Sequence, residues 1–382
     1  MSCPSGSGAP RMTPAYRGLV RRSSVVLVAS ALALLTACTS GSTGDDTSAA
    51  PASTNGTPSA MPTPRPTPTP TPVAAPPTAV PAGCDGATVV DVATADQLQR
   101  ALDEAAPGQV IRLADGRYEG NFVATARATA DQPIHLCGSR AAILDGGAVD
   151  GDYTLHLSAA TYWQVTGLTV TGGQKGVMVD AGVGNTISDL EVSSVGDEGI
   201  HLRSNSTDNV VSGNTVRDTG LRKPKFGEGI YVGSAQSNWC QTSGCQPDQS
   251  DRNVIDGNHI SGTTAESVDI KEGTTGGILR HNTFDGAGMT ESDSWVDVKG
   301  NGWTIEENTG TNTPTDGFQV HDVLDGWGRD NEFAGNTAVV DGDGYGINVA
   351  GPREVREQTA VRCDNAATDA GSGLSNVECR SS

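Results

Sequence analysis

Three related segments, SVDIK at residues 267–271, WVDVK at 295–299 and GFQVH at 317–321, carry the pattern that decides the fold of this chain. In each segment two apolar residues alternate with polar ones, which is the period of a strand with one buried face. The outward polar positions are Asp269, Lys271, Asp297, Lys299, Gln319 and His321. If the three segments lie side by side, they place a row of carboxylates next to a row of cations. Such rows are unusual on a sheet surface, so these segments also indicate where a functional site lies.

The same pattern recurs along the chain from residue 153 onward. Its apolar-polar-apolar triplets fall at 155–157, 177–179, 200–202, 230–232, 268–270, 296–298, 318–320 and 347–349. Each repeat is here called a coil. A single coil cannot bury its own apolar face, so successive coils must stack on one another. One Asn also recurs at the same place in five successive coils, at Asn214, Asn258, Asn282, Asn308 and Asn336. Its recurrence predicts an internal ladder of amides inside a parallel β-helix.

The start of the folded region has a different pattern. Residues 94–105 combine a capping box with helical spacing of apolar residues, and a strand follows at 110–113. The segments DQL at 96–98 and PGQVIRLADGRY at 107–118 are similar to the N-terminal cap of polysaccharide lyases of the chondroitinase B and alginate lyase group. Nearly all of 84–382 resembles the pectate-lyase-like superfamily. The resemblance implies an all-β fold, a single-stranded right-handed parallel β-helix with a short N-terminal helical cap.

Composition supports this fold class and excludes one class of partner. The chain of 382 residues holds 49 glycines and only 4% aromatic residues, which suits short strands and tight turns better than helical packing. Its formal net charge of −20 argues against nucleic acid, because phosphate binding needs a basic face.

The first 82 residues are predicted to direct export. An apolar run at 25–35 follows three arginines and ends in LTAC at 35–38, which resembles a bacterial lipobox and would make Cys38 the lipid-modified residue. An ordinary secretory signal is the alternative. Residues 1–38 are thus a lipoprotein signal peptide and 39–82 a Ser/Thr/Pro-rich disordered tether. We expect a protein facing outside the cell membrane or secreted, with the lipid anchor as its membrane contact.

Residues 83–382 form the predicted β-helix domain, with the cap and first coils at 83–150, central coils at 151–350 and a disulfide-stapled end at 351–382. Six cysteines remain in it, an even number that indicates disulfides in an exported protein. Sequence proximity pairs Cys240 with Cys245 and Cys363 with Cys379, which leaves Cys84 for Cys137.

Stacked coils lie ~4.8 Å apart, so equivalent residues form columns. The middle coils then bring together five candidate catalytic residues: Lys271, Lys299, His321, Arg203 and Tyr231. β-Elimination on a uronate polymer needs neutralisation of the sugar carboxylate, a base for the C5 proton and an acid for the leaving oxygen. Lys271 above Lys299 is a like-charge pair, and we expect it to lower the pKa of one ammonium toward that of a usable base.

Other residues of the columns are candidates for metal and substrate binding. Glu266, Asp269 and Asp297 offer hard oxygen ligands for Ca²⁺, which would bridge an acidic protein and an acidic substrate. The candidate substrate-binding residues are His201, Trp295, Gln319, Arg222 and Lys223. The resemblance implies Ca²⁺ and a Lys or Arg base; the Arg-His-Gly segment of the similar group is replaced here by Gln-Val-His at 319–321. The loops around 221–226 and 240–245 are candidate cleft walls.

These residues predict a cell-surface polysaccharide lyase that cleaves an acidic polysaccharide, acting as a monomer. A glycoside hydrolase or C5-epimerase is an alternative, since Asp269 and Asp297 lie on adjacent coils. A carbohydrate-binding β-helix without turnover is another, because the fold hosts all of them. In that case the Asp and Lys columns are a salt-bridge ladder that only solubilises the sheet.

Overall fold

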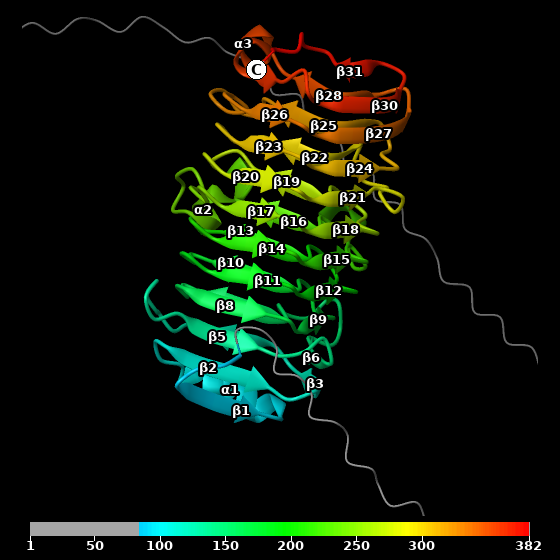
Figure 1. The fold of residues 1–382 in the computed structure, drawn as a ribbon. Coiled ribbons are helices and arrows are strands. Elements are labelled where there is room, and N and C mark those ends of the chain that lie inside the picture. The colour runs from blue at the N-terminus through cyan, green and yellow to red at the C-terminus, as the bar shows by residue number, and fades with distance from the viewer. Residues whose placement is uncertain (1–83, 382) are drawn as a thin grey trace, which may run out of the picture. The chain divides into compact units, whose positions relative to one another are not determined.

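A computed structural model describes residues 84–381, and they form three parallel sheets, here called A, B and C (Figure 1). Each turn of the chain adds one strand to sheet A, one to B and one to C, and every strand pairs in parallel with its copy in the next turn. This is the predicted single-stranded right-handed parallel β-helix. The apolar residues of all three sheets point inward into one continuous core.

The strands are short, and their bounds are as follows. Sheet A contains β1 (Thr88–Val92), β2 (Gln109–Leu113), β5 (Ile134–Cys137), β8 (Trp163–Thr166), β11 (Thr186–Ser188), β14 (Val210–Ser212), β17 (Val254–Asp256), β20 (Ile278–Arg280), β23 (Thr304–Glu306), β26 (Glu332–Ala334) and β29 (Ala360–Val361). Sheet B contains β3 (Gly116–Glu119), β6 (Ala142–Asp145), β9 (Thr169–Thr171), β12 (Glu191–Ser193), β15 (Thr215–Arg217), β18 (His259–Ser261), β21 (Thr283–Asp285), β24 (Thr309–Thr311), β27 (Thr337–Gly342) and β30 (Ala366–Ala370). Sheet C contains β4 (Phe122–Ala124), β7 (Leu155–Ser158), β10 (Val177–Asp180), β13 (Ile200–Arg203), β16 (Ile230–Val232), β19 (Val268–Ile270), β22 (Ser294–Val298), β25 (Asp316–His321), β28 (Tyr345–Ala350) and β31 (Gly373–Ser375).

Helix α1 (Ala95–Asp103) closes the N-terminal end of the core (Figure 1). Its N-terminus is capped by Thr94 as predicted, since Thr94 Oγ1 accepts from the backbone N–H of Gln97, while Gln97 Oε1 accepts from the backbone N–H of Ala93, one residue before the cap. Leu98 and Leu102 are fully buried against the first strands. The helix therefore covers apolar residues that would otherwise face solvent at the end of the stack.

The predicted asparagine ladder is confirmed between sheets A and B. Asn258 Nδ2 donates to Asn282 Oδ1 at 2.9 Å, and Asn258 Oδ1 accepts from Asn214 Nδ2 at 2.9 Å. The ladder extends one coil further than predicted, to Asn365. A second, shorter ladder lies between sheets C and A, at Asn185, Asn209 and Asn253. Buried amides thus hold each coil in register with the next.

One coil is much longer than its neighbours. Successive rungs of the second ladder are 24 residues apart at Asn185 and Asn209 but 44 apart at Asn209 and Asn253. The additional residues form two loops that flank β16 in sheet C, 218–229 and 233–253. The first contains the 3₁₀ turn η1 (Pro224–Phe226); the second contains η2 (Gln236–Asn238) and α2 (Trp239–Thr242).

Three disulfides stabilise the coil ends and the second loop. They join Cys84 to Cys137, Cys240 to Cys245 and Cys363 to Cys379, which confirms the pairing expected from the sequence. Helix α3 (Arg353–Gln358) lies near the C-terminal end of the stack (Figure 1). Within residues 84–381, no helix is long and apolar enough to cross a membrane. The predicted signal peptide, Cys38 and the tether lie outside the described residues.

Candidate active site

The outer face of sheet C carries the two columns expected from the repeats. Pairing of β16, β19, β22 and β25 places Tyr231, Asp269, Asp297 and Gln319 side by side on successive coils. The second column follows two residues further along each strand, and it contains Arg203, Lys271, Lys299 and His321. Most of these outward side chains are nevertheless covered, because they pack against one another and beneath the flanking loops.

Two lysines share one carboxylate at the centre of this face. Lys299 Nζ lies 2.7 Å from Asp269 Oδ1 and 2.8 Å from Asp297 Oδ2, and Lys271 Nζ lies 2.5 Å from Asp269 Oδ2. Lys299 is therefore enclosed by two acids, whereas Lys271 has a single carboxylate partner and its Nζ lies 5.0 Å from the Tyr231 ring centroid. Lys271 is the lysine that retains an open side.

The expected lowering of a lysine pKa is wrong for this arrangement. Burial by itself would lower the pKa of Lys271, but the charge of Asp269 and the hydrogen bond to it outweigh burial and raise that pKa. The pKa of Lys299 is raised in the same way by Asp269 and Asp297, although Lys271 opposes the shift. The two ammonium groups repel each other, yet the carboxylates between them dominate because they are closer.

A group of carboxylates lies beside the lysines. Glu228, Glu266 and Asp269 each place an oxygen within 4.8 Å of the other two. Burial raises the pKa of Glu228 well above its ordinary value, and burial together with Asp269 raises the pKa of Glu266 to about 8. Glu228 Oε2 is buried and has no hydrogen-bond partner in residues 84–381. Hard oxygen donors with an unpartnered buried oxygen fit a divalent cation such as Ca²⁺, which would neutralise their repulsion.

This cluster differs from the predicted ligand set by one residue. Glu266 and Asp269 belong to it, but Asp297 does not, and Glu228 takes the third place. Asp297 instead pairs with Lys299, accepts a hydrogen bond from Ser294 and lies 3.4 Å from His321 Nε2. Asp269 is itself engaged by both lysines, so the carboxylates of the cluster that have no ammonium partner in residues 84–381 are Glu228 and Glu266.

A pocket of 260 Å³ opens next to these residues, over β7, β10, β13 and β16. Its lining includes Tyr153, Lys175, Glu198, His201, Arg203, Arg222 and Tyr231. The two loops that flank β16 also line it, the first through Phe226 and the second through Asn238, Gln241 and Thr242. The structure thus brings four sequence-predicted residues to one hollow: His201, Arg203, Arg222 and Tyr231. Lys271, Lys299 and His321 do not line this pocket.

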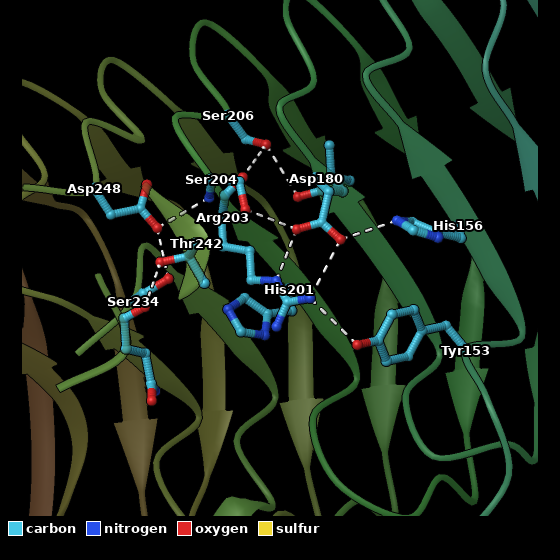
Figure 2. Close-up of polar contacts among 12 residues, drawn as sticks. Tyr153, His156, Asp180, His201, Arg203, Ser204, Ser206, Ser234, Thr242 and Asp248 are labelled. Atoms are coloured by element: carbon cyan, nitrogen blue, oxygen red, sulfur yellow. Dashed lines mark hydrogen bonds and ion pairs between the residues drawn. The ribbon is translucent and has the colours of Figure 1, made fainter. Parts of the chain in front are cut away.

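One wall of the pocket is held by a polar network around Asp180 (Figure 2). Asp180 accepts hydrogen bonds from Arg203 Nε at 2.7 Å and Ser204 Oγ at 2.9 Å, and its other oxygen lies 2.9 Å from His156 Nε2. Burial by itself would raise the pKa of Asp180, but the hydrogen bonds from His156 and Arg203 outweigh it and hold that pKa well below its ordinary value. Arg203 also donates to Tyr153 Oη at 3.2 Å. Its guanidinium is thereby fixed at the pocket edge.

His201 connects this wall to Tyr231. Its Nε2 donates to the carbonyl of Gly233 at 3.0 Å, and its Nδ1 lies 3.3 Å from Glu198 Oε1. The rings of His201 and Tyr231 meet edge to face with centroids 4.4 Å apart. Burial raises the pKa of Tyr231 well above its ordinary value, and Asp269 adds to this. The phenol therefore stays protonated and can act as a proton donor.

Comparison with known proteins identifies the family. The chain is 38% identical to an alginate lyase from Paenibacillus sp. str. FPU-7, whose crystal structure superposes with a TM-score of 0.71 over 76% of this chain and 98% of that one. The chain belongs to the family of that enzyme, within the pectate-lyase-like β-helix superfamily. A family model described as Pel9A-like, right handed beta helix region matches residues 79–219. Pectate lyase Pel9A shares the fold, at 15% identity, a TM-score of 0.56 and coverage of 78% of this chain and 79% of that one. No curated protein matches the chain.

Two predicted substrate contacts of this family member are not accessible. Trp295 is fully buried: its ring meets Phe318 edge to face at 5.8 Å, and its Nε1 donates to the carbonyl of Thr311. The ring fits because residue 310 is glycine, and a Cβ there would lie 2.4 Å from the ring. Trp295 is thus a core residue. Gln319 is also covered; it donates to Asp316 Oδ2 and its Oε1 contacts His321.

Several pocket residues of this β-helix were not predicted as site residues. Lys175 pairs with Glu198 across neighbouring coils, and both side chains are buried. Tyr153 and Phe226 also line the pocket. Lys175 stands two residues before its triplet, the register position that Glu198 and Glu266 hold in later coils, so the repeat itself was the available sign for it. The network in Figure 2 could have been predicted from the repeat, because Asp180 stands two residues after Met178 and its register partner on the next coil is Arg203.

Proposed function

We propose that this protein is a polysaccharide lyase that cleaves alginate, a uronate polymer, by β-elimination. The observation that carries the proposal is the Lys271, Asp269 and Tyr231 cluster beside a pocket rich in cations, in a chain 38% identical to an alginate lyase over nearly all of that enzyme. Lys175, Arg203 and Arg222 line the pocket, each paired with a carboxylate, and they reduce locally the repulsion between a protein of net charge −20 and a polyanion.

We assign the two proton transfers to Lys271 and Tyr231. Lys271 is the more accessible of the two central lysines and acts as the base for the C5 proton. Tyr231, whose hydroxyl stays protonated, donates a proton to the oxygen that leaves C4. Lys299, enclosed by Asp269 and Asp297, positions these carboxylates rather than reacting. Arg203 at the pocket edge binds a substrate carboxylate.

The acidic cluster of Glu228, Glu266 and Asp269 is the proposed site of a divalent cation, which when bound would supply positive charge next to the substrate carboxylate and weaken the hold of Asp269 on the Lys271 proton. Without the cation the raised pKa of Lys271 keeps it an ammonium. This arrangement supports a lyase that works faster with Ca²⁺ than after chelation.

The test is incubation with alginate, pectate and glycosaminoglycans, with absorbance of the unsaturated product as the readout. We expect absorbance to rise with alginate, and to rise faster with Ca²⁺ than with chelator. Reducing ends without that absorbance would instead identify a hydrolase. The same β-helix fold supports that alternative, but Asp269 and Asp297, the carboxylate pair on which it was based, are both engaged by Lys299.

A further inference from the structure

The lysines of this chain are distributed unevenly. There are five, and all of them lie in or beside the coils that carry the candidate site. Lys175, Lys271 and Lys299 are paired with buried carboxylates. Lys223 and Lys225 lie on the loop before β16 and form no ion pair with any residue in 84–381. In a chain with 45 acidic residues, exposed ammonium groups without a carboxylate partner are available for an outside anion.

Both lysines surround one exposed aromatic ring. Phe226 is 40% exposed and lines the pocket beside Tyr231 and His201. Lys223 Nζ lies 5.5 Å from the centroid of its ring and Lys225 Nζ lies 6.0 Å from it. Cation–π contacts at exposed positions are weak, so a carboxylate can draw either ammonium away from the ring.

The loop that presents these side chains is anchored at several points. Arg222 Nε donates to Asp197 Oδ1 at 3.0 Å, and Thr264 Oγ1 donates to the carbonyl of Pro224 at 2.7 Å. The backbone N–H of Phe226 donates to the carbonyl of Lys223 at 2.8 Å, which closes the 3₁₀ turn. The backbone that carries the ring and the two lysines is therefore fixed beside the pocket, which Phe226 lines.

We propose that Phe226, Lys223 and Lys225 form an additional uronate-binding subsite at the rim of the pocket. The phenyl ring covers the apolar C–H face of a pyranose, and the two ammonium groups bind the carboxylates of that sugar and its neighbour. This inference rests on the proposed function, since it places a further part of the same polymer next to the reacting sugars. It predicts that long chains bind better than the shortest substrates.

The test compares four variants of the full chain on long alginate and on the shortest oligouronate that is cleaved. In K223Q/K225Q, we expect the ratio of kcat/KM on long chains to kcat/KM on the short substrate to fall about tenfold, because two charge-assisted contacts are lost. F226A should lower the same ratio, and F226Y, which keeps an aromatic ring, should retain it. The matched control is R353Q/R356Q, which removes two cations from α3; its ratio should equal that of the unaltered chain. A ratio in K223Q/K225Q equal to that of the control overturns the subsite.

Binding without turnover separates this inference from the proposed reaction. In native gels cast with alginate, the unaltered chain should be retarded, and K223Q/K225Q should migrate markedly faster while keeping its melting temperature. If no unsaturated product forms but retardation depends on the two lysines, the subsite stands and the lyase assignment fails. If product forms while gel retardation and the kcat/KM ratio match the R353Q/R356Q control, the lyase assignment stands and the subsite fails.

Discussion

Two polar arrays run along successive coils of the β-helix, and they differ in how completely their polar groups are paired. Inside, each central asparagine of the ladder meets an identical residue above and below, and every amide is satisfied. Outside, on sheet C, unlike groups follow one another: Arg203, Tyr231, Asp269, Lys299. There the buried Glu228 Oε2 has no partner in residues 84–381.

This difference shows that the inner array serves the stability of the fold and the outer array serves binding. A ladder of identical, satisfied amides stabilises register and has no remaining capacity to bind anything else. An array of unlike, incompletely paired charges adds little to fold stability, because the free energy lost when each charge is removed from water is not recovered by its ion pairs. Changes to the ladder should therefore affect folding, whereas changes to the outer array should affect binding and turnover.

The largest expected effect is on turnover, from Lys271→Ala. Loss of a proton-transfer group should lower kcat on alginate by about 10²–10⁴-fold, while the melting temperature changes little because Lys271 lies at the edge of the cluster. Product absorbance and thermal unfolding check the two parts. The matched variant Lys299→Ala should instead lower the melting temperature clearly, because it leaves Asp269 and Asp297 buried without their shared cation. Native activity in Lys271→Ala would remove that residue from the reaction.

The next effect is on folding, from Asn258→Ala in the ladder. The substitution removes hydrogen bonds to Asn282 and to the carbonyl of Val211, and it strands the amide of Asn214. We expect the free energy of unfolding to fall by about 2–4 kcal/mol. Activity per folded molecule should be retained, as measured by denaturant titration and by kcat on the folded fraction. A loss of kcat without loss of stability would contradict the division between the arrays.

A smaller effect is expected from cation binding at the outer array. If Ca²⁺ occupies the Glu228, Glu266 and Asp269 cluster, a concentration of 100 times its Kd should stabilise the fold by about 2.7 kcal/mol. Glu228→Gln should abolish this gain in thermal unfolding and in calorimetric titration with Ca²⁺. The exposed Glu354→Gln is the control and should keep the gain. A gain that survives Glu228→Gln would place the cation elsewhere.

The smallest effect concerns acid sensitivity of the network around Asp180. Because the folded-state pKa of Asp180 lies below its ordinary value of 3.8, its carboxylate stabilises the fold above that pH, and the contribution is lost as pH falls below it. In Asp180→Asn we expect the loss of stability between about pH 5 and pH 2 to shrink by about 1 kcal/mol. Denaturant titrations at several pH values measure this. An unchanged pH dependence would show that the pairs with Arg203 and His156 contribute nothing.

Much of the scaffold was predictable from the sequence, because its signals are local and repeated. The period of two in segments such as 267–271 gave the strands, and the recurrence of Asn258 and its copies gave the ladder. The disulfides followed from spacing, since Cys240 and Cys245 can meet only across one loop. The residues of the two outer columns were also placed correctly on one face, as the pairing of Asp269 with Asp297 shows.

The burial of individual side chains and their pKa values could not be predicted, because both depend on distances that a sequence repeat does not encode. Trp295 stands one residue before its triplet, near the start of β22, and its side chain turns inward only because Gly310 on β24 leaves space for the ring. The pKa of Lys271 could not be inferred from its like-charged neighbour alone, because Asp269 lies closer to it. Partners that lie on a loop, such as Arg222 beside Asp197, can be placed only when the path of the loop is known.

The long coil has a consequence for how such proteins diversify. Asn209 and Asn253 are adjacent rungs although 44 residues separate them, so the spine tolerates any excursion that returns to the next rung. The segments beside β16 can therefore be exchanged, lengthened or grafted from one relative to another without refolding the scaffold. On the proposed function, we expect exchange of these loops to change polymer preference, while the coils that carry Lys271 and Tyr231 stay as they are.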